Sequence, residues 1–318
     1  MLPGTMRRIA VVGAGFMGHG IGQEFAVAGY DVVLHDVGRE ALERAVERIG
    51  EGLARLAAWE VIPADAPAAA LARIRTTTAL PEAARDADLV VEAVYEDLAL
   101  KKEVLGELDR LCPGRTILSS NTSTFMPSLL ASATGRPDRV VGIHFFYPPS
   151  LLPLVEIVPG PATSAETVGT VHALLRQMGK RPIVVRKECF GFVANRLQFA
   201  LQREALYLVE HGIASAEDVD VAVRDGFGRR LAFAGPFEIA EPIGWDLELQ
   251  IQKHLLPHLA AGTSPSRLLE DKVERGELGV KTGEGFYRWT AESAAAWQRR
   301  MWQGLVSLLP RRAQGGGG

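Results

Sequence analysis

The feature that most constrains the fold is a glycine-rich segment directly after an apolar run near the N-terminus. Residues 9–12 (IAVV) lead into residues 13–18 (GAGFMG), a GxGxxG pattern. After a strand, the first glycine permits a tight turn, the second lets the backbone approach a pyrophosphate, and the third lets the next helix pack on the sheet. The helix N-terminus offers free amides to phosphates. The pattern predicts a dinucleotide-binding βαβ unit that contacts its cofactor at Gly13, Gly15, Phe16, Met17 and Gly18.

An acidic residue at the end of the next expected strand points to the identity of the dinucleotide. Asp36 follows the apolar run of residues 32–34. A carboxylate there accepts hydrogen bonds from both ribose hydroxyls and repels a 2′-phosphate, which favours NAD over NADP. A glycine turn followed by a helix-capping aspartate is the purely structural alternative, and the combined spacing argues against it.

Alternation of short apolar runs with helical patterns continues through the first 185 or so residues. Because several runs are continuously apolar, we expect strands covered on both faces, in a Rossmann-type doubly wound parallel α/β sheet. Residues 39–75 are rich in Ala, Arg and Glu and are expected to form an inserted helical hairpin. The predicted strands cover residues 9–12, 32–34, 89–93, 116–119, 140–143, 154–158 and 182–185.

The pattern changes near Phe192, where strand signals stop and helix-period segments follow. We therefore expect an NAD-binding domain over residues 1–187 and an all-helical domain for substrate binding and dimerisation over residues 188–310. The tail, residues 311–318, has nothing to bury and is expected to be disordered.

Composition excludes several classes of protein. The net charge of −3 gives no electrostatic case for nucleic acid or an anionic membrane surface. The two cysteines, Cys112 and Cys189, are too few for a disulfide framework and favour a reducing cytoplasm. Because we find neither a leader-like segment nor an apolar run long enough to span a bilayer, we expect a soluble cytoplasmic protein. No metal-binding pattern is expected either.

Four polar residues further along suit alcohol oxidation. Removal of the hydroxyl proton needs a base, and histidine, with an ordinary pKa of about 6.5, suits that role. His144 follows an apolar run, at the carboxyl edge where open α/β sheets bind ligands. A carboxylate on the expected adjacent strand, Glu156, would orient the ring and stabilise the imidazolium. Ser123 and Asn195 are short polar groups suited to hold the hydroxyl or the ketone oxygen.

Each of these residues also has a structural interpretation. A hydrogen-bonded histidine beside a loop would explain His144, and a solvent-facing position on a strand would explain Glu156. Ser123 would cap a helix that starts near Met126, and Asn195 would cap the first helix of the second domain. Taken singly, the residues leave these alternatives open.

Five ordered segments together resemble the 3-hydroxyacyl-CoA dehydrogenase family over about residues 7–289. They are residues 119–123 (SSNTS), 144–148 (HFFYP), 153–156 (PLVE), 191–196 (GFVANR) and 281–287 (KTGEGFY). The resemblance implies NAD-dependent oxidation of an L-3-hydroxyacyl group to a 3-ketoacyl group, in fatty acid metabolism, by a homodimer paired through the C-terminal domain. It implies a catalytic pair, His144 and Glu156, helped by the substrate-binding Ser123 and Asn195. It also implies cofactor contacts at Ala93, Glu96, Lys101 and Asn121.

Several departures bear on the substrate. Tyr147 stands where the family has an asparagine that helps orient the nicotinamide, and no lysine precedes Lys101 to meet a CoA nucleotide. Residues 126–128 (MPS), 148–149 (PP), 195–198 (NRLQ) and 230–236 (RLAFAGP) resemble the gulonate dehydrogenase and lens crystallin branch, which implies a free hydroxy acid as substrate. The guanidinium of Arg230 would then clamp its carboxylate. A 3-hydroxyacyl-CoA is the favoured substrate. A free 3-hydroxy acid such as gulonate or carnitine is the alternative, and a non-catalytic NADH-binding protein is a third, less favoured one.

Overall fold

The computed structural model describes residues 6–309, whose contacts divide the chain into two units. Of the described residues, the first unit contains 6–195 and 305–309, and the second contains 196–304. The sequence predicts the boundary near Lys187. In the structure, residues 188–195 group instead with the first unit. The tail that was expected to be disordered, residues 311–318, lies outside the described residues.

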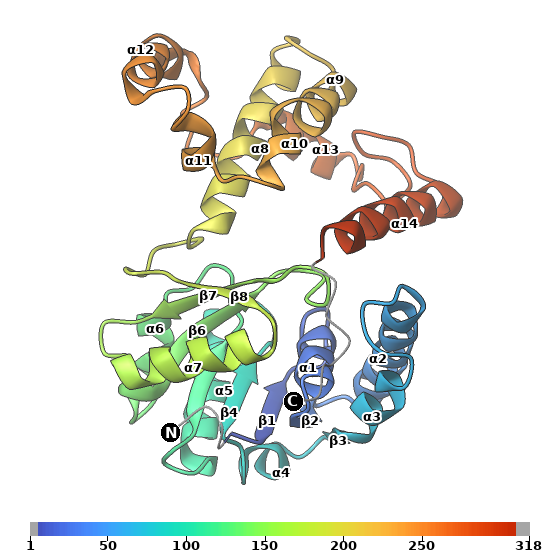
Figure 1. Ribbon diagram of the computed structural model, residues 1–318, viewed down its shortest axis with the longest axis vertical. Coiled ribbons are helices and arrows are strands. Elements are labelled where there is room, and N and C mark those ends of the chain that lie inside the picture. The colour runs from blue at the N-terminus through green and yellow to red at the C-terminus, as the bar shows by residue number, and fades with distance from the viewer. Residues whose placement is uncertain (1–5, 310–318) are drawn as a thin grey trace. The chain divides into compact units, whose positions relative to one another are not determined.

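An eight-stranded sheet forms the centre of the first unit (Figure 1), in the order β3-β2-β1-β4-β5-β6-β7-β8. All neighbouring strands are parallel except β6 and β7, which are antiparallel, so the expected doubly wound α/β sheet is confirmed. The strands are β1 (Arg8–Val12), β2 (Asp31–His35), β3 (Ile74–Thr77), β4 (Leu89–Glu92), β5 (Ile117–Ser120), β6 (Val140–Phe145), β7 (Leu154–Pro159) and β8 (Arg181–Val184).

The expected helical hairpin over residues 39–75 is only partly right. Two helices form, α2 (Arg39–Ala58) and α3 (Ala66–Ala72), but the chain then enters β3, which pairs with β2 at the sheet edge. The prediction failed because the β3 segment, IRTT, has two half-buried and two exposed residues and lacks an apolar run. Its β-branched residues tolerate a strand, and pairing with the edge of β2 decides the outcome.

Helices cover both faces of the sheet because successive strand residues point to opposite sides. Ala10 and Val12 of β1 pack with Leu105 of α5, whereas a Cβ added at Gly18 of α1 would lie 3.6 Å from the Val11 side chain. The helices of this unit are α1 (Gly18–Val27), α2, α3, α4 (Leu80–Ala84), α5 (Leu98–Leu111), α6 (Pro127–Ala131) and α7 (Ala165–Gln177), with a 3-10 turn, η2 (Pro137–Arg139). Figure 1 shows α7 along one face of the sheet.

The second unit is helical, as expected, and its described residues hold no strand beyond isolated bridges at Gly279, Glu284 and Arg288. No helix within residues 6–309 is long and apolar enough to cross a membrane. The helices are α8 (Ala194–Glu210), α9 (Ala216–Val221), α10 (Gly228–Leu231), α11 (Pro236–Ala240), α12 (Trp245–Leu255), α13 (Arg267–Glu274) and α14 (Ala291–Leu308), with short segments η3 (Ala222–Phe227) and η4 (Leu256–His258).

Candidate active site

A buried histidine–carboxylate pair lies at the only antiparallel junction among the described strands. The register of β6 and β7 places His144 directly opposite Glu156, so both side chains share one face of the sheet. Nδ1 of His144 lies 2.8 Å from Oε2 of Glu156. The histidine is 5% exposed and the glutamate fully buried. With Nδ1 engaged by the carboxylate, Nε2 is the ring atom left to exchange a proton with a substrate.

Glu156 is held from two sides. Its Oε1 accepts hydrogen bonds from the backbone amides of Val193 at 3.0 Å and Ala194 at 2.9 Å, while Oε2 faces His144. Burial by itself raises the pKa of this carboxyl, but the hydrogen bonds from His144, Ala194 and Val193 outweigh it and lower the pKa below the usual range. Glu156 therefore stays ionised near neutral pH, which suits a group that orients an imidazole and stabilises its charged form.

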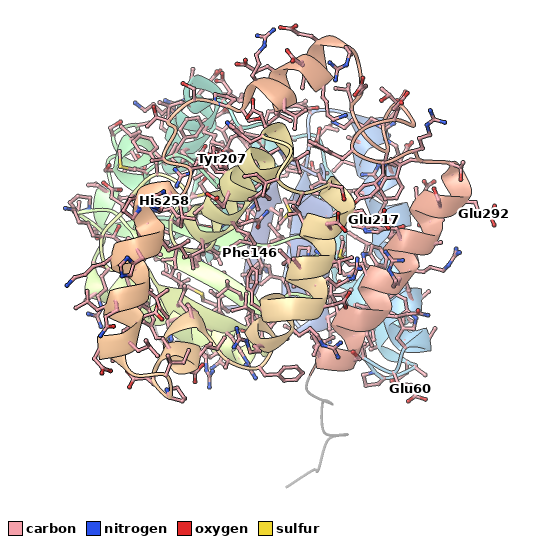
Figure 2. The ribbon with its side chains drawn as sticks, turned by 90° about the horizontal axis from the view of Figure 1, so that it is seen from above. Glu60, Phe146, Tyr207, Glu217, His258 and Glu292 are labelled. Carbon is pink, nitrogen blue, oxygen red and sulfur yellow. The ribbon has the colours of Figure 1, made fainter. Side chains whose placement is uncertain are left out.

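Aromatic rings enclose the imidazole. The ring centroid of Phe146, labelled in Figure 2, lies 4.4 Å from that of His144, and the ring of Phe192 meets it edge-on at 5.7 Å. Phe192 is fully buried and adopts a left-handed φ of 49°, directly after Gly191 at 75°. This tight turn places both the Phe192 ring and the amides of Val193 and Ala194 against the pair, so residues 191–194 build its supporting wall.

Ser123 and Asn195 come together beside this wall. The side-chain amide of Asn195 donates to the backbone carbonyl of Ser123 at 3.5 Å. Asn195 directly follows Ala194, whose amide contacts Glu156. Asn121, in the same loop as Ser123, accepts a hydrogen bond from the backbone amide of Phe145 at 2.8 Å. Hydrogen bonds therefore link the loop after β5 to the end of β6, and the structure brings all four expected catalytic residues into one connected group.

Glu96 holds the loop that carries Ser123. Its Oε1 accepts hydrogen bonds from the Thr122 hydroxyl at 2.5 Å, from the Ser123 amide at 3.2 Å and from both the amide and the hydroxyl of Thr124. Burial raises the pKa of this carboxyl, but the threonine hydroxyls and the nearby Lys101 more than offset the effect, and the pKa is lowered. Whatever contact Glu96 makes with a ribose, it also acts as an anchor for residues 122–124.

Lys101 lies at the centre of a buried ionic network. Its side chain is 1% exposed, and Nζ lies 2.9 Å from Oε1 of Glu92 and 3.2 Å from Oε2 of Glu96. Nζ also donates to the Val94 carbonyl. Glu92, fully buried at the end of β4, accepts a further hydrogen bond from the Ser120 hydroxyl at 2.6 Å. Sequence reasoning did not assign Glu92 a role at the site. The sequence feature that could have indicated a role for Glu92 is its position as an acidic residue at the end of an otherwise apolar strand. A charge buried there needs a cationic partner.

The glycine loop has the geometry that a dinucleotide requires. Gly13 has a φ of 102°, and a Cβ there would lie 2.6 Å from the carbonyl oxygen of Ala93. A Cβ at Gly18 would lie 1.7 Å from the carbonyl oxygen of Gly13, so neither position tolerates a side chain. A Cβ at Gly15 would meet nothing within 4 Å. The loop therefore packs tightly on its protein side and has open space above Gly15, where a pyrophosphate fits.

One carboxylate oxygen of Asp36 contacts the glycine loop, and the other contacts the start of α2. Oδ2 accepts a hydrogen bond from the Ala14 amide at 2.9 Å, and Oδ1 accepts one from the Gly38 amide at 3.1 Å. Each oxygen keeps a further lone pair for a ribose hydroxyl. Asp36 thus couples the end of β2 to the glycine loop, in the position expected for the ribose acceptor.

Arg230 is the one predicted site residue that belongs to the second unit, where it lies exposed on α10. Its role as a carboxylate clamp stays a prediction. Among the described residues, no group of three or more His, Cys, Asp or Glu side chains is arranged to hold a metal ion.

Comparison with known families identifies both parts of the chain. Residues 8–189 match the model of the 3-hydroxyacyl-CoA dehydrogenase NAD binding domain. Residues 191–289 match the model of the 3-hydroxyacyl-CoA dehydrogenase C-terminal domain. The two matches together account for nearly all of the described residues.

Individual relatives fall into two groups. A probable 3-hydroxybutyryl-CoA dehydrogenase of Bacillus subtilis is 40% identical over 89% of this chain and 97% of its own length. The solved (S)-3-hydroxybutyryl-CoA dehydrogenase of Ralstonia eutropha is 35% identical, with a TM-score of 0.74 over 90% of this chain and all of the other. The solved 5-formyl-3-hydroxy-2-methylpyridine 4-carboxylic acid 5-dehydrogenase, described as an NAD⁺-dependent dismutase, is 33% identical, with a TM-score of 0.89 over 96% of this chain and 97% of that one.

Proposed function

The chain belongs to the 3-hydroxyacyl-CoA dehydrogenase family, and on that premise we propose that His144 and Glu156 are the catalytic pair of an NAD-dependent dehydrogenase for 3-hydroxyacyl-CoA thioesters. Membership makes the chain an oxidoreductase that oxidises a CH–OH group with NAD. The observation that carries the assignment of the pair is the 2.8 Å contact between Nδ1 of His144 and Glu156, since it leaves Nε2 as a base.

In the proposed mechanism, Nε2 of His144 removes the proton of the substrate 3-hydroxyl. Bound NAD supplies a hydride acceptor for the 3-carbon. The positive charge that develops on the imidazole is stabilised by the carboxylate of Glu156, which is itself fixed by the amides of Val193 and Ala194. The surrounding rings of Phe146 and Phe192 hold the imidazole in place and exclude water.

Ser123 and Asn195 hold the substrate oxygen in this proposal. The hydrogen bond of Asn195 to the Ser123 carbonyl fixes the two residues relative to each other. The Ser123 hydroxyl and the Asn195 amide then offer donors to an oxygen that turns from hydroxyl into ketone. Glu96 contributes indirectly, because its hydrogen bonds keep residues 122–124 in one conformation.

The residues that would hold NAD are those of the glycine loop, residues 13–18, together with Asp36, Ala93, Glu96, Lys101 and Asn121. The loop would hold the pyrophosphate, and Asp36 would accept hydrogen bonds from the adenosine ribose. The side-chain oxygen of Asn121 is bonded to the Phe145 amide, so its side-chain nitrogen would be the atom that donates to the cofactor. Lys101 acts through Glu92 and Glu96, with which its ammonium is paired.

Asp36→Asn is expected to raise the Kd for NAD roughly tenfold, because a charged acceptor of ribose hydroxyls is lost. The same change should narrow the preference for NAD over NADP, since it removes the charge that repels a 2′-phosphate. Titration calorimetry with both dinucleotides measures the two effects. The control is Asp31→Asn, at the exposed start of the same strand. An unchanged Kd for NAD would remove Asp36 from the cofactor site.

A thioester substrate is supported by relatives named 3-hydroxybutyryl-CoA dehydrogenases, among them the B. subtilis protein at 40% identity and the R. eutropha enzyme at 35%. The test compares L-3-hydroxybutyryl-CoA with free L-3-hydroxybutyrate, which differ only in the CoA group, by following NADH formation. We expect kcat/KM to be at least about a hundredfold higher for the thioester. The reason is that binding of the CoA group, which is remote from the reacting carbon, helps to stabilise the transition state. Equal or greater activity on the free acid would contradict a CoA substrate.

A free carboxylic acid is the second candidate substrate. It is supported by the pyridine carboxylate dehydrogenase, whose TM-score of 0.89 exceeds the 0.74 of the R. eutropha enzyme. Arg230 would then bind the carboxylate, for an aromatic hydroxy acid or for acids such as gulonate and carnitine. On such an acid, Arg230→Ala should raise KM about tenfold or more. Arg229→Ala, on the same short helix, is the matched control, and equal KM values for the two variants would exclude the clamp.

We also propose a homodimer formed through the second unit. Neither α8 nor α14 has a buried residue in the described chain, although both are amphipathic. Large apolar side chains are exposed in this unit, among them Leu197, Phe199 and Phe233 at 60%, 60% and 82%. Apolar surface of this extent favours an interface. A solution mass near the 34.4 kDa of one chain would contradict the dimer.

We further propose a cytoplasmic location for the protein. The two free thiols fit a reducing compartment, and localisation of a tagged chain tests the proposal.

A further inference from the structure

One short segment after His144 lies along one face of the cofactor-binding helix. Phe16, Gly20 and Glu24 are spaced four residues apart, which places them on the same side of α1 and the turn before it. Phe16 stacks on Tyr147, with ring centroids 4.1 Å apart and an interplanar angle of 29°. A Cβ at Gly20 would lie 3.2 Å from the Pro149 ring. Glu24 pairs with Lys180, whose ammonium also donates to the Pro149 carbonyl.

At one end of this contact, a buried ion pair between Glu24 and Lys180 holds the segment against α1. Glu24 and Lys180 are each 5% exposed, and their ion pair joins α1 to the residue before β8, while the hydrogen bond of Lys180 to the Pro149 carbonyl adds the segment after β6. A buried pair of this kind is costly to disturb, because either charge alone would be left without a partner. Pro149 is itself buried against Gly20. The backbone of residues 147–149 is thereby fixed relative to the glycine loop.

At the other end of the contact, the rings of Phe16 and Tyr147 are exposed to solvent. Phe16 is 60% exposed and Tyr147 41% exposed, although their rings are stacked. Phe16 lies inside the glycine loop, and Tyr147 lies three positions after His144. The stacked rings therefore connect the glycine loop to the segment that follows the proposed base. The nicotinamide riboside has to lie beside these rings if a hydride is to leave a substrate carbon next to His144.

We propose that Tyr147, stacked on Phe16, forms an aromatic wall that positions the nicotinamide half of NAD. This inference rests on the proposed NAD site but not on the choice of substrate. A flat apolar ring presents contact area at low entropic cost, and the Phe16 ring and the clamped Pro149 keep it in place.

The test measures the Kd of NAD and of ADP, which lacks the nicotinamide riboside, by titration calorimetry without any substrate. Tyr147→Ala should raise the Kd for NAD roughly two- to tenfold and leave the Kd for ADP within about twofold. Tyr147→Phe keeps the ring and should bind both ligands as the unaltered chain does. Phe16→Ala should weaken NAD as well, and adding it to Tyr147→Ala should cost less than the sum of the two single changes.

Two results would overturn the proposal. An unchanged Kd for NAD in Tyr147→Ala would show that the ring does not touch the cofactor. An equal loss of NAD and ADP would show that the change distorts the glycine loop as a whole. Because no hydroxyacyl compound enters the experiment, neither result can be confused with failure of the proposed substrate. Thermal unfolding of each variant, recorded alongside, identifies any that fails to fold.

Discussion

Replacing His144 by alanine should lower kcat at least about a hundredfold while the Kd for NAD stays close to that of the unaltered chain. The variant loses the base that accepts the hydroxyl proton, and no second imidazole contacts Glu156 among the described residues. Its glycine loop and Asp36 remain as they are. The measurements are NADH formation with L-3-hydroxybutyryl-CoA and calorimetric titration of NAD.

The control for this prediction is His172→Ala, a histidine of α7 with no part in the proposed site. It should retain the activity of the unaltered chain. Glu156→Gln should fall between the two variants, because the imidazole remains but its charged form loses a carboxylate partner. If His144→Ala kept a kcat within about tenfold of the original, a different group would have to be the base.

Lys101→Met should lower the free energy of unfolding by roughly 3–5 kcal/mol, since it leaves Glu92 fully buried without its cation. Glu92 would keep only the Ser120 hydroxyl and the Val94 amide as partners. A loss of this size is a large share of the 5–15 kcal/mol that a typical domain has. Urea unfolding followed by circular dichroism measures it, and the m-value shows whether the transition remains two-state.

Lys102→Met is the matched control, since it changes the neighbouring, only half-buried lysine of the same helix. It should cost less than about 1 kcal/mol. The double variant Glu92→Gln with Lys101→Met should recover much of the loss, because both charges are then absent. Equal destabilisation by Lys101→Met and Lys102→Met would show that the buried network contributes little to stability.

Much of the fold was predictable because it depends on local patterns. The run of residues 9–12, the glycines of residues 13–18 and Asp36 predicted β1, α1 and the cofactor loop, all of which the structure contains. The change of pattern near Phe192 predicted the helical second unit. The edge strand β3 was missed, since a half-exposed strand of four residues has no pattern that distinguishes it from a helix end.

The site was predictable in part. His144 and Glu156 were chosen as a pair because of their order along the chain and the family resemblance, but their contact depends on the antiparallel register of β6 and β7. Lys101 was expected at the cofactor, and the structure shows its ammonium between Glu92 and Glu96. The stacking of Phe16 on Tyr147 joins residues far apart in sequence, and no local pattern indicates it.

The amino-acid sequence by itself determined most of the strands and helices, with the edge strand β3 as an exception, and which residue types are present for binding a dinucleotide and for alcohol oxidation. These follow from periodicity, from glycine's freedom at the turn and from the chemistry of single side chains. Only the tertiary structure decided which carboxylate each cation and imidazole meets, because such pairing depends on strand register and on helix packing between distant segments. Burial then makes those pairings strong, since a charge removed from water is stable only beside its partner.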